Sequence, residues 1–389
     1  MDDMLMERPK LAQQLLKDIG LATERQPEKP RDIGLPAGQV VISADNHLEV
    51  TEDIFYENFP AHMKNRAPRV WFDKYWHIGF RDGAQQFGED ERIQFLLTSL
   101  NPSESFDRNI RKGQIMQEGI QKEIVFTQSL LAFVRHKDLE ARELIFRIHN
   151  EWFASLQRED PGAFFGVGLC SNWWEESRYE AAVGQIVDLD LRTIQIPCML
   201  KDAQGQEISL ASEQMDRFWS IVEEADLPVN FHVGEDPSLA GRGGYAINYM
   251  HATSPFRRPL AQLIFGGVFD RHPRLKVVFT EGSINWVPGF LQDAEHLTDG
   301  MYGVFDWKIQ QRPSDYWHSQ CWATFMVDKI GLEQLDYIGA DRVMWSADFP
   351  HSESTFGIGW SAMEDVVKRT TEPQARMILG DTAARLYRL

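Results

Sequence analysis

The sequence has few cysteines and no long apolar run, and these absences exclude several classes of protein. Among 389 residues there are 3 cysteines, Cys170, Cys198 and Cys321, each in a different apolar stretch. Scattered thiols of this kind are typical of a reducing compartment and fit neither a disulfide framework nor a zinc knuckle. No run of about 18 apolar residues occurs, so we expect no membrane-spanning helix. The opening segment is charged and amphipathic and lacks the apolar core of a signal peptide, which predicts a cytoplasmic protein.

Positive charge is also scarce. Lys and Arg number 40 against 58 Asp and Glu, which gives a formal net charge of −18 at pH 7. Such a surface repels phosphate backbones, so we expect no nucleic-acid partner. No G-x-G-x-x-G motif follows any apolar run, which argues against an open nucleotide-binding sheet. What the sequence has in excess is aromatic residues, with 12 Trp and 24 Phe. These suit a large core and an apolar substrate pocket.

Eight short runs rich in β-branched or aromatic residues alternate with longer segments of helical period. The predicted strands are residues 39–43, 123–127, 164–171, 192–198, 228–234, 276–282, 321–326 and 342–351. Parallel strands need long crossovers, and closing a sheet at eight strands removes both of its edges. The alternation therefore predicts an α/β fold of the (β/α)8 or TIM-barrel type.

Two segments fall outside this alternation. Residues 1–36 become rich in proline and charge, which predicts a short helix and an extended N-terminal arm outside a barrel domain of residues 37–389. The gap after the first predicted strand is too long for one helix. It contains RVWFDKYWHIGFRDG, a pattern that predicts a β-hairpin. We therefore expect an insertion at about residues 67–105 that distorts the barrel.

Residue types that bind metal ions stand at the ends of four predicted strands. Barrel active sites lie at the carboxyl ends of the strands. The residues found there are Asp45 and His47 at the first strand, His232 at the fifth, Glu281 at the sixth, and Asp348 and His351 at the eighth. Carboxylates within about 4 Å of one another in a low-dielectric site repel by several kcal/mol unless a cation compensates them. We therefore predict a site for one or two divalent ions, where mixed nitrogen and oxygen ligation suits zinc, iron, manganese or nickel.

Each of these residues has a structural explanation when it is taken alone. Asp348 could cap the segment that follows it, and Glu281 could lie near the N-terminus of a helix starting at Ser283. Such explanations do not account for ligand types at four strand ends together, and this coincidence favours the metal site.

Three basic residues follow the fifth predicted strand, His251, Arg257 and Arg258. They form a local positive region on an acidic protein and are candidate contacts for a phosphate or carboxylate of the substrate. An ordinary solvated helix start is the alternative.

Several segments resemble a known family: SADNHLE, NFHVG, GVFDRHPRLKVVFTEGSINWVPGFLQDAE, RVMWSADFPHSEST and ILGDTAARLY. They are similar to the amidohydrolase-related TIM-barrel family of metal-dependent decarboxylases and hydrolases, from about Val40 to the C-terminus. The resemblance implies that Asp45, His47, His232 and Asp348 bind metal. The sequence departs from the family in lacking a first-strand His-x-His and a fourth-strand lysine. Glu281 also stands where decarboxylases commonly present a histidine.

These departures argue against plain amide hydrolysis and decarboxylation. In its carboxylate-rich site the sequence is closer to the TIM-barrel nonheme diiron monooxygenases of diterpenoid (platensimycin and platencin) biosynthesis. That resemblance implies two Fe ions, O2, an electron donor, and hydroxylation of a bulky apolar or CoA-linked substrate. Glu281, Asp348 and His351 would then be catalytic. The alternative is a decarboxylase or hydrolase with one Zn or Mn ion, in which Asp348 acts as a base. A homodimer is a further expectation for a barrel of this size.

Overall fold

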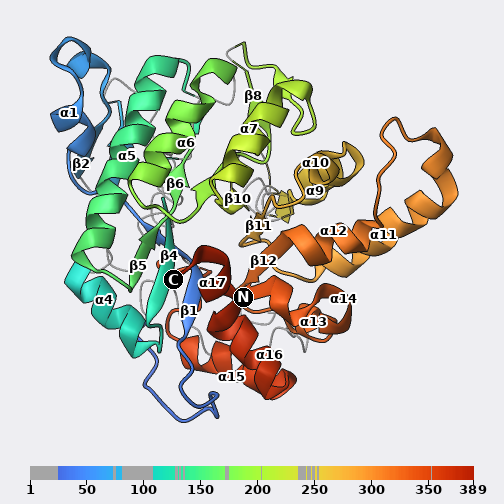
Figure 1. The fold of residues 1–389 in the computed structure, drawn as a ribbon. Coiled ribbons are helices and arrows are strands. Elements are labelled where there is room, and N and C mark those ends of the chain that lie inside the picture. The colour runs from blue at the N-terminus through green and yellow to red at the C-terminus, as the bar shows by residue number, and fades with distance from the viewer. Residues whose placement is uncertain are drawn as a thin grey trace.

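The computed structural model describes residues 25–72, 76–80, 108–127, 130, 133–134, 136–170, 175–202, 204–234, 242, 247, 250–251, 254–351 and 353–389. Within them, parallel strands alternate with helices along the chain, which makes this an α/β fold (Figure 1).

The parallel strands form two sheets. Their order is β1-β4-β5 in the first and β13-β12-β11-β10-β7-β6 in the second. The strands are β1 Ile42–Leu48, β4 Lys122–Thr127, β5 Phe164–Gly166, β6 Gly168–Leu169, β7 Ile194–Gln195, β10 Val229–His232, β11 Val277–Thr280, β12 Cys321–Phe325 and β13 Val343–Trp345. A strand lies within or overlaps each of the eight predicted runs, and the third run is divided into β5 and β6.

The two sheets are linked at both of their edges, by the continuous chain between β5 and β6 at one edge and by backbone hydrogen bonds at the other. Around the break between β5 and β6, Val167 N donates to Val125 O at 2.9 Å and Gly168 N donates to Thr193 O at 3.0 Å. On the other side, the segment after β13 bonds to β1, where Asp348 N donates to Asp45 O at 2.8 Å. One core cluster also joins strands of both sheets, since it contains Ile42, Ile124, Phe165, Val278 and Met344.

The helices pack their apolar faces against these sheets. The main ones are α1 Ile54–Asn58, α4 Arg108–Gln117, α5 Leu139–Glu159, α6 Tyr179–Asp188, α7 Glu213–Glu224, α9 Arg257–Phe265, α10 Val268–Arg271, α11 Trp286–Met301, α12 Pro313–Gln320, α13 Lys329–Leu332, α14 Leu335–Ile338, α15 Gly359–Arg369, α16 Glu372–Arg376, a π-helical turn at Met377–Asp381, and α17 Thr382–Tyr387. In α7 the buried residues Met215, Phe218, Trp219 and Val222 follow the spacing of one helical face. No helix among the described residues has the length and hydropathy needed to cross a bilayer.

The predicted hairpin is present. Strand β2 Arg69–Phe72 pairs antiparallel with β3 Trp76–Gly79. Asp53 anchors it, because its carboxylate accepts from Val70 N at 2.8 Å and from Arg69 Nη2 at 2.6 Å. The rest of the expected insertion, residues 81–105, lies outside the described residues. A second antiparallel pair, β8 Leu200–Lys201 with β9 Glu207–Ile208, was not predicted, since strands of two residues have no readable alternation.

The described part of the N-terminal arm, residues 25–36, has no helix or strand and lies against the segment around α15. Arg25 Nη1 donates to Ser354 O at 3.0 Å, and Ser361 N donates to a Glu28 carboxylate oxygen at 2.8 Å. The helix expected near the start lies outside the described residues, and the domain boundary at residue 36 stays a prediction.

A buried carboxylate, Glu118, joins this arm to the loop before α15. It is 3% exposed and accepts hydrogen bonds from the backbone N–H groups of Glu28, Gly357 and Gly359. Burial raises the pKa of Glu118 from 4.5 to about 7, although the three N–H groups lower it. Between these two pH values the folded protein binds more protons at this group than the unfolded chain does. The contribution of Glu118 to stability therefore falls as pH rises through this range.

We expect Glu118→Gln to remove this pH dependence. The free energy of unfolding of the variant minus that of the parent protein should increase between about pH 5 and about pH 8, because only the parent ionises a buried group and is thereby destabilised. Urea unfolding at several pH values measures the difference. Glu372→Gln, on the exposed surface of α16, is the matched control. A constant difference across the pH range would contradict the prediction.

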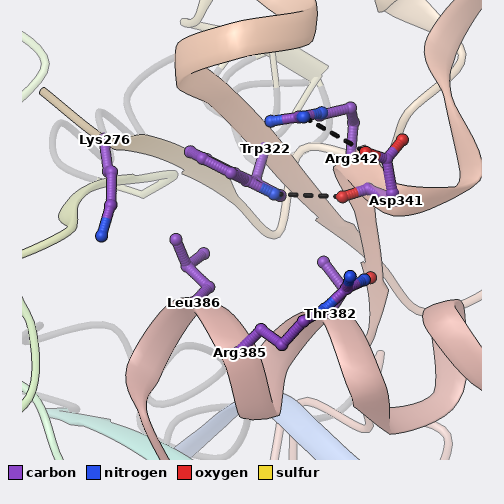
Figure 2. Close-up of a pocket in the computed structure, with 7 residues that line it drawn as sticks. All are labelled: Lys276, Trp322, Asp341, Arg342, Thr382, Arg385 and Leu386. Atoms are coloured by element: carbon purple, nitrogen blue, oxygen red, sulfur yellow. Dashed lines mark hydrogen bonds and ion pairs between the residues drawn. The ribbon is translucent and has the colours of Figure 1, made fainter. Parts of the chain in front are cut away.

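A cavity lies at the amino ends of β11, β12 and β13, where α17 packs against the strands (Figure 2). The acidic and imidazole side chains predicted to bind metal lie at the opposite, carboxyl ends of the strands.

Candidate metal centre

The six side chains predicted as metal ligands come together at the carboxyl ends of the strands. His232 is the last residue of β10, Glu281 follows β11 directly, and Asp348 lies three residues after β13. Strand β1 runs to Leu48, so Asp45 and His47 lie inside it and not beyond its end as expected. Its register against β4 shifts between Ser43 and Asn46, which marks an irregularity beside the two ligand candidates.

Two of the carboxylates sit on left-handed backbone. Glu281 has φ +72° and Asp348 has φ +59°. This conformation costs a residue other than glycine about 1 kcal/mol or more and is concentrated at functional sites. Hydrogen bonds hold both turns, from Glu281 N to Thr324 Oγ1 at 2.8 Å and from Asp348 N to Asp45 O at 2.8 Å. The fold thus retains a carboxylate at two positions where glycine would be unstrained.

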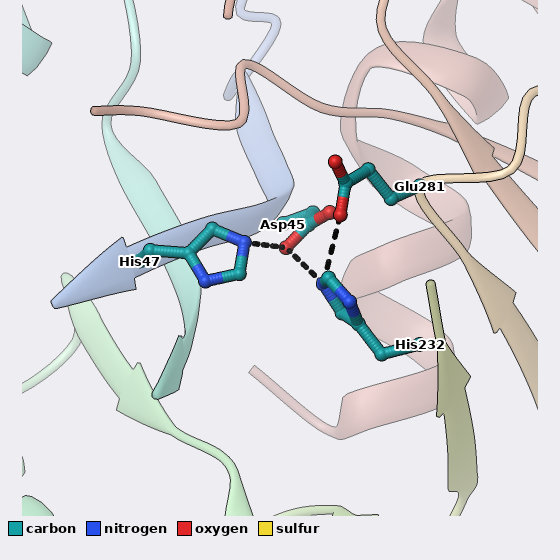
Figure 3. Close-up of side chains that lie close together, drawn as sticks. All are labelled: Asp45, His47, His232 and Glu281. Carbon is teal, nitrogen blue, oxygen red and sulfur yellow. Dashed lines mark hydrogen bonds and ion pairs between the residues drawn. The ribbon is translucent and has the colours of Figure 1, made fainter. Parts of the chain in front are cut away.

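Four of the six residues form a first ligand group, drawn in Figure 3. Asp45 Oδ1 lies 3.4 Å from His47 Nε2 and 3.4 Å from His232 Nε2. His232 Nε2 also lies 3.4 Å from Glu281 Oε2. Each residue offers one ligand atom, and these four atoms lie within 4.8 Å of one another. All four side chains are buried, and their polar atoms point toward one centre.

A second ligand group shares His47 and Glu281 with the first and adds Asp348 and His351. Asp348 Oδ1 lies 3.2 Å from His47 Nε2 and 2.8 Å from His351 Nδ1. The His351 and His47 rings stack with centroids 4.0 Å apart. The His351 side chain is 19% exposed, whereas that of Asp348 is fully buried, so solvent reaches the cluster on the His351 side.

Backbone carbonyls orient two of the imidazoles. His47 Nδ1 lies 3.2 Å from Thr127 O, and His232 Nδ1 lies 2.9 Å from Val233 O. In the neutral form of each ring, a proton on Nδ1 can be donated to the carbonyl. The electron pair of Nε2 then faces the centre and is available to a metal ion.

A buried network behind β1 holds the strand in place. Arg111 of α4 donates to His47 O at 3.1 Å and forms an ion pair with Glu123. Glu123 also accepts from Asn46 Nδ2 at 2.7 Å. The sequence reading missed Arg111, which lies in a long gap with no recognisable motif.

Burial and mutual charge shift the pKa values of the cluster. Burial, then the charge of Asp348, raises the pKa of Glu281, and burial also raises that of Asp348. Burial lowers the pKa of His232, but Asp45 and Glu281 outweigh it and raise the value to about 9. Burial, then the charge of His351, holds the pKa of His47 well below its usual range. Protons thus provide the positive charge that compensates the acids when no cation is bound.

The donor atoms fit a divalent metal ion. Asp45 Oδ2, His47 Nε2 and Asp348 Oδ2 are buried, and none of them has a hydrogen-bond partner within the part of the chain that the structure describes. Leaving such a group unpaired costs about 1–3 kcal/mol, and more for a charge. A metal ion would supply the missing partner, and two imidazoles with carboxylates suit manganese, iron or zinc. Either one ion in the first group or two ions sharing His47 and Glu281 is compatible with these positions.

The three basic substrate candidates lie on the surface. His251 is exposed, Arg257 forms an ion pair with Asp293, and Arg258 forms one with Glu207. Within the described ranges, no hydrogen bond or ion pair links these three residues to the six-residue cluster. Their contact with a substrate stays a prediction.

His149 is a buried histidine outside the cluster and provides a test of the ligand set. It is fully buried in α5, its ring lies 4.1 Å from that of Phe153, and burial lowers its pKa to about 3. His149→Gln should therefore leave the metal content per folded chain unchanged. Elemental analysis after gel filtration measures this. Loss of metal from a folded His149→Gln protein would show that the ligand set is incomplete.

Comparison with known families gives a match over most of the chain. A family model described as Amidohydrolase matches residues 129–389. The matched segment contains His232, Glu281, Asp348 and His351, whereas Asp45 and His47 precede it.

Solved structures with similar folds cover nearly the whole chain. An amidohydrolase from Mycobacterium avium subsp. paratuberculosis K-10 is 18% identical, with a TM-score of 0.73, and 90% of this chain aligns with 98% of that one. The 5-carboxyvanillate decarboxylase of Sphingomonas paucimobilis is 18% identical, with a TM-score of 0.65 and coverage of 90% and 100%. A dihydroxybenzoic acid decarboxylase from Polaromonas sp. JS666, solved with manganese and 2-nitroresorcinol, is 17% identical, with a TM-score of 0.66 and coverage of 90% and 97%. At these identities the likeness concerns the fold. It gives no support to the closer resemblance to diiron monooxygenases.

Proposed function

The chain belongs to the amidohydrolase family, and from this premise we propose that it is a metal-dependent decarboxylase of a small carboxylic acid. The observation that carries the proposal is the convergence of six side chains of the types that bind metal ions, five of them almost fully buried. The names of the similar structures favour decarboxylation over the oxygenase chemistry that the sequence suggested. Hydrolysis of a small acid derivative by the same residues is the nearest alternative.

We further infer that the two sheets form one closed eight-stranded barrel. The continuous chain between β5 and β6, the backbone hydrogen bonds between β1 and the segment after β13, and the core cluster common to both sheets support this inference. Barrel enzymes carry their active sites at the carboxyl ends of the strands, where the cluster lies.

In this proposal the first ligand group holds one ion, manganese or zinc. When bound there, the ion would supply positive charge that orients an acidic substrate and stabilises the negative charge left on the substrate when CO2 departs. Its ligands are Asp45, His47, His232 and Glu281. Phe126, whose ring centroid is 4.8 Å from that of His232, provides an apolar wall beside them.

In the proposed reaction Asp348 donates a proton to the substrate and His351 reprotonates Asp348. When the carbon–carboxylate bond breaks, its electron pair stays on the substrate carbon and CO2 leaves, so that carbon needs a proton. Burial raises the pKa of Asp348, which favours a proton on its carboxyl group near neutral pH. His351, 2.8 Å away and partly exposed, can return a proton from solvent to Asp348.

The experiment that tests this function combines metal analysis with product detection. Protein loaded with manganese, zinc or iron is incubated with a panel of aromatic carboxylic acids, with and without O2. One manganese or zinc per chain and CO2 release that does not depend on O2 would support the proposal. A protein that binds no metal, or that turns over only with O2, would overturn it.

One observation favours a second candidate. The two ligand groups share His47 and Glu281 and together contain three carboxylates, a donor set that suits two ions. This supports a nonheme diiron monooxygenase that uses O2 and an electron donor on a bulky apolar or CoA-linked substrate. Arg257, Arg258 and His251 would then be candidate phosphate contacts. Two irons per chain with O2-dependent hydroxylation would favour this candidate.

A further inference from the structure

The cavity at the amino ends of the strands lies far from the metal centre. It has a volume of about 230 Å³ and is lined from two sides (Figure 2). Lys276 directly precedes β11, Trp322 is the second residue of β12, and Arg342 directly precedes β13, while Thr382 and Arg385 come from α17. Lys276 and Glu281 lie five residues apart across β11, which corresponds to about 16 Å of extended chain. A ligand in this cavity would not touch the six-residue cluster.

The lining of the cavity is positive although the protein is strongly acidic. Lys276, Arg342 and Arg385 line it together with one acid, Asp341, on a chain with net charge −18. Asp341 forms an ion pair with Arg342 at 3.1 Å. Lys276 is paired with Asp226 outside the lining. Arg385 has no ion pair within the described part of the chain. The positive charge of the cavity is therefore only partly compensated.

Two buried donors of the lining have no partner. Thr382 is 2% exposed, and its Oγ1 has no hydrogen-bond partner among the described residues. The Nε atom of Arg342 is also buried and has no hydrogen-bond partner among these residues. An unpaired buried polar group is costly, so a ligand with acceptor oxygens would satisfy a real deficit. Thr382 follows directly on the π-helical turn Met377–Asp381, a local irregularity that is frequent at functional sites.

The cavity also has an apolar part with a fixed orientation. Trp322 Nε1 donates to Asp341 O at 3.1 Å, which holds the indole in place, and the Arg342 guanidinium lies 4.9 Å from its ring centroid. Leu386 lies across the cavity from Trp322 in Figure 2. Charged donors next to an apolar surface suit a ligand with an anionic group and a small organic part.

We propose that this cavity binds a small phosphorylated metabolite, with its phosphate held by Lys276, Arg342 and Arg385 and its organic part against Trp322 and Leu386. Phosphate presents the several acceptor oxygens that guanidinium, ammonium and hydroxyl donors require. The proposal does not depend on the reaction at the metal centre.

The test uses the full-length, metal-loaded protein with inorganic phosphate as the probe, titrated by calorimetry at constant ionic strength. Phosphate should bind more tightly than sulfate or chloride, and Arg385→Gln should weaken its binding by about tenfold or more. Thr382→Val, which keeps the side-chain shape, should also weaken it. Arg274→Gln removes an exposed arginine outside the cavity and should leave the affinity unchanged.

Binding of phosphate to the metal centre would survive both cavity substitutions. Equal affinities in the parent protein, Arg385→Gln and Thr382→Val would therefore overturn the proposal, as would the absence of phosphate-specific binding. A crystal structure with phosphate between Lys276 and Arg385 would establish it directly.

Discussion

Replacing His47 by alanine is expected to remove bound metal from the protein and to abolish turnover. His47 belongs to both ligand groups, and its Nε2 lies 3.4 Å from Asp45 Oδ1 and 3.2 Å from Asp348 Oδ1. Without it, each group keeps one imidazole, and a carboxylate-rich remainder binds manganese or zinc less selectively. Loss of contacts that only orient a ligand already costs about 10- to 100-fold in metal affinity, so loss of the ligand should cost more. Elemental analysis of the purified protein and the rate of CO2 release measure the two effects.

The fold should survive this substitution, because the apolar core clusters, which do not include His47, carry the stability. Circular dichroism and the thermal midpoint test this point, and His47→Gln, which keeps most of the side-chain volume, covers the case in which the alanine variant is unstable. His296→Ala, at an exposed histidine of α11, is the matched control and should retain metal and activity. Full metal content in a folded His47→Ala protein would refute the ligand set of both proposed functions.

Much of the strand framework was readable from the sequence. Runs such as residues 123–127 and 276–282 concentrate β-branched and aromatic residues between helical segments, and strands β4 and β11 lie there. Because parallel strands end at one side of a sheet, the same pattern predicts that His232, Glu281 and Asp348 lie close together. Local composition determines where a strand lies, and topology then determines which of its ends meet.

The details of the centre depend on contacts between distant segments, which local patterns do not encode. The positive φ angles of Glu281 and Asp348 depend on hydrogen bonds to Thr324 and Asp45. His47 and Glu281 belong to both ligand groups, and they come from segments that lie far apart in the sequence. The spacing of residues therefore predicted a metal site but could not determine whether it holds one ion or two.

The positive cavity could not be predicted from the sequence, for a different reason. Metal ligands such as Glu281 are expected at the carboxyl ends of strands, whereas Lys276 and Arg342 precede their strands. Thr382 and Arg385 lie in the last helix, and only packing of α17 against the strands brings them to the same cavity. A pattern divided between strand starts and the C-terminal helix has no signature along the chain.

Asp348→Asn should separate the two proposed functions. The change keeps the size of the side chain and removes its charge and its ability to donate a carboxyl proton. Asp348 belongs to the second ligand group only, so the first group stays complete. If the protein is a decarboxylase with one ion, metal content should stay at one per chain and turnover should fall by about 10²- to 10⁴-fold, the usual contribution of a general acid.

If the protein instead holds two ions, the same substitution should lower the metal content from two per chain to one, because the second group loses a ligand. Asp336→Asn, at an exposed aspartate of α14, is the control and should change neither quantity. Elemental analysis and turnover measured on the same sample distinguish the outcomes. Unchanged turnover in Asp348→Asn would remove this residue from both mechanisms. Its strained backbone, its full burial and its 2.8 Å distance to His351 would then have a structural role only.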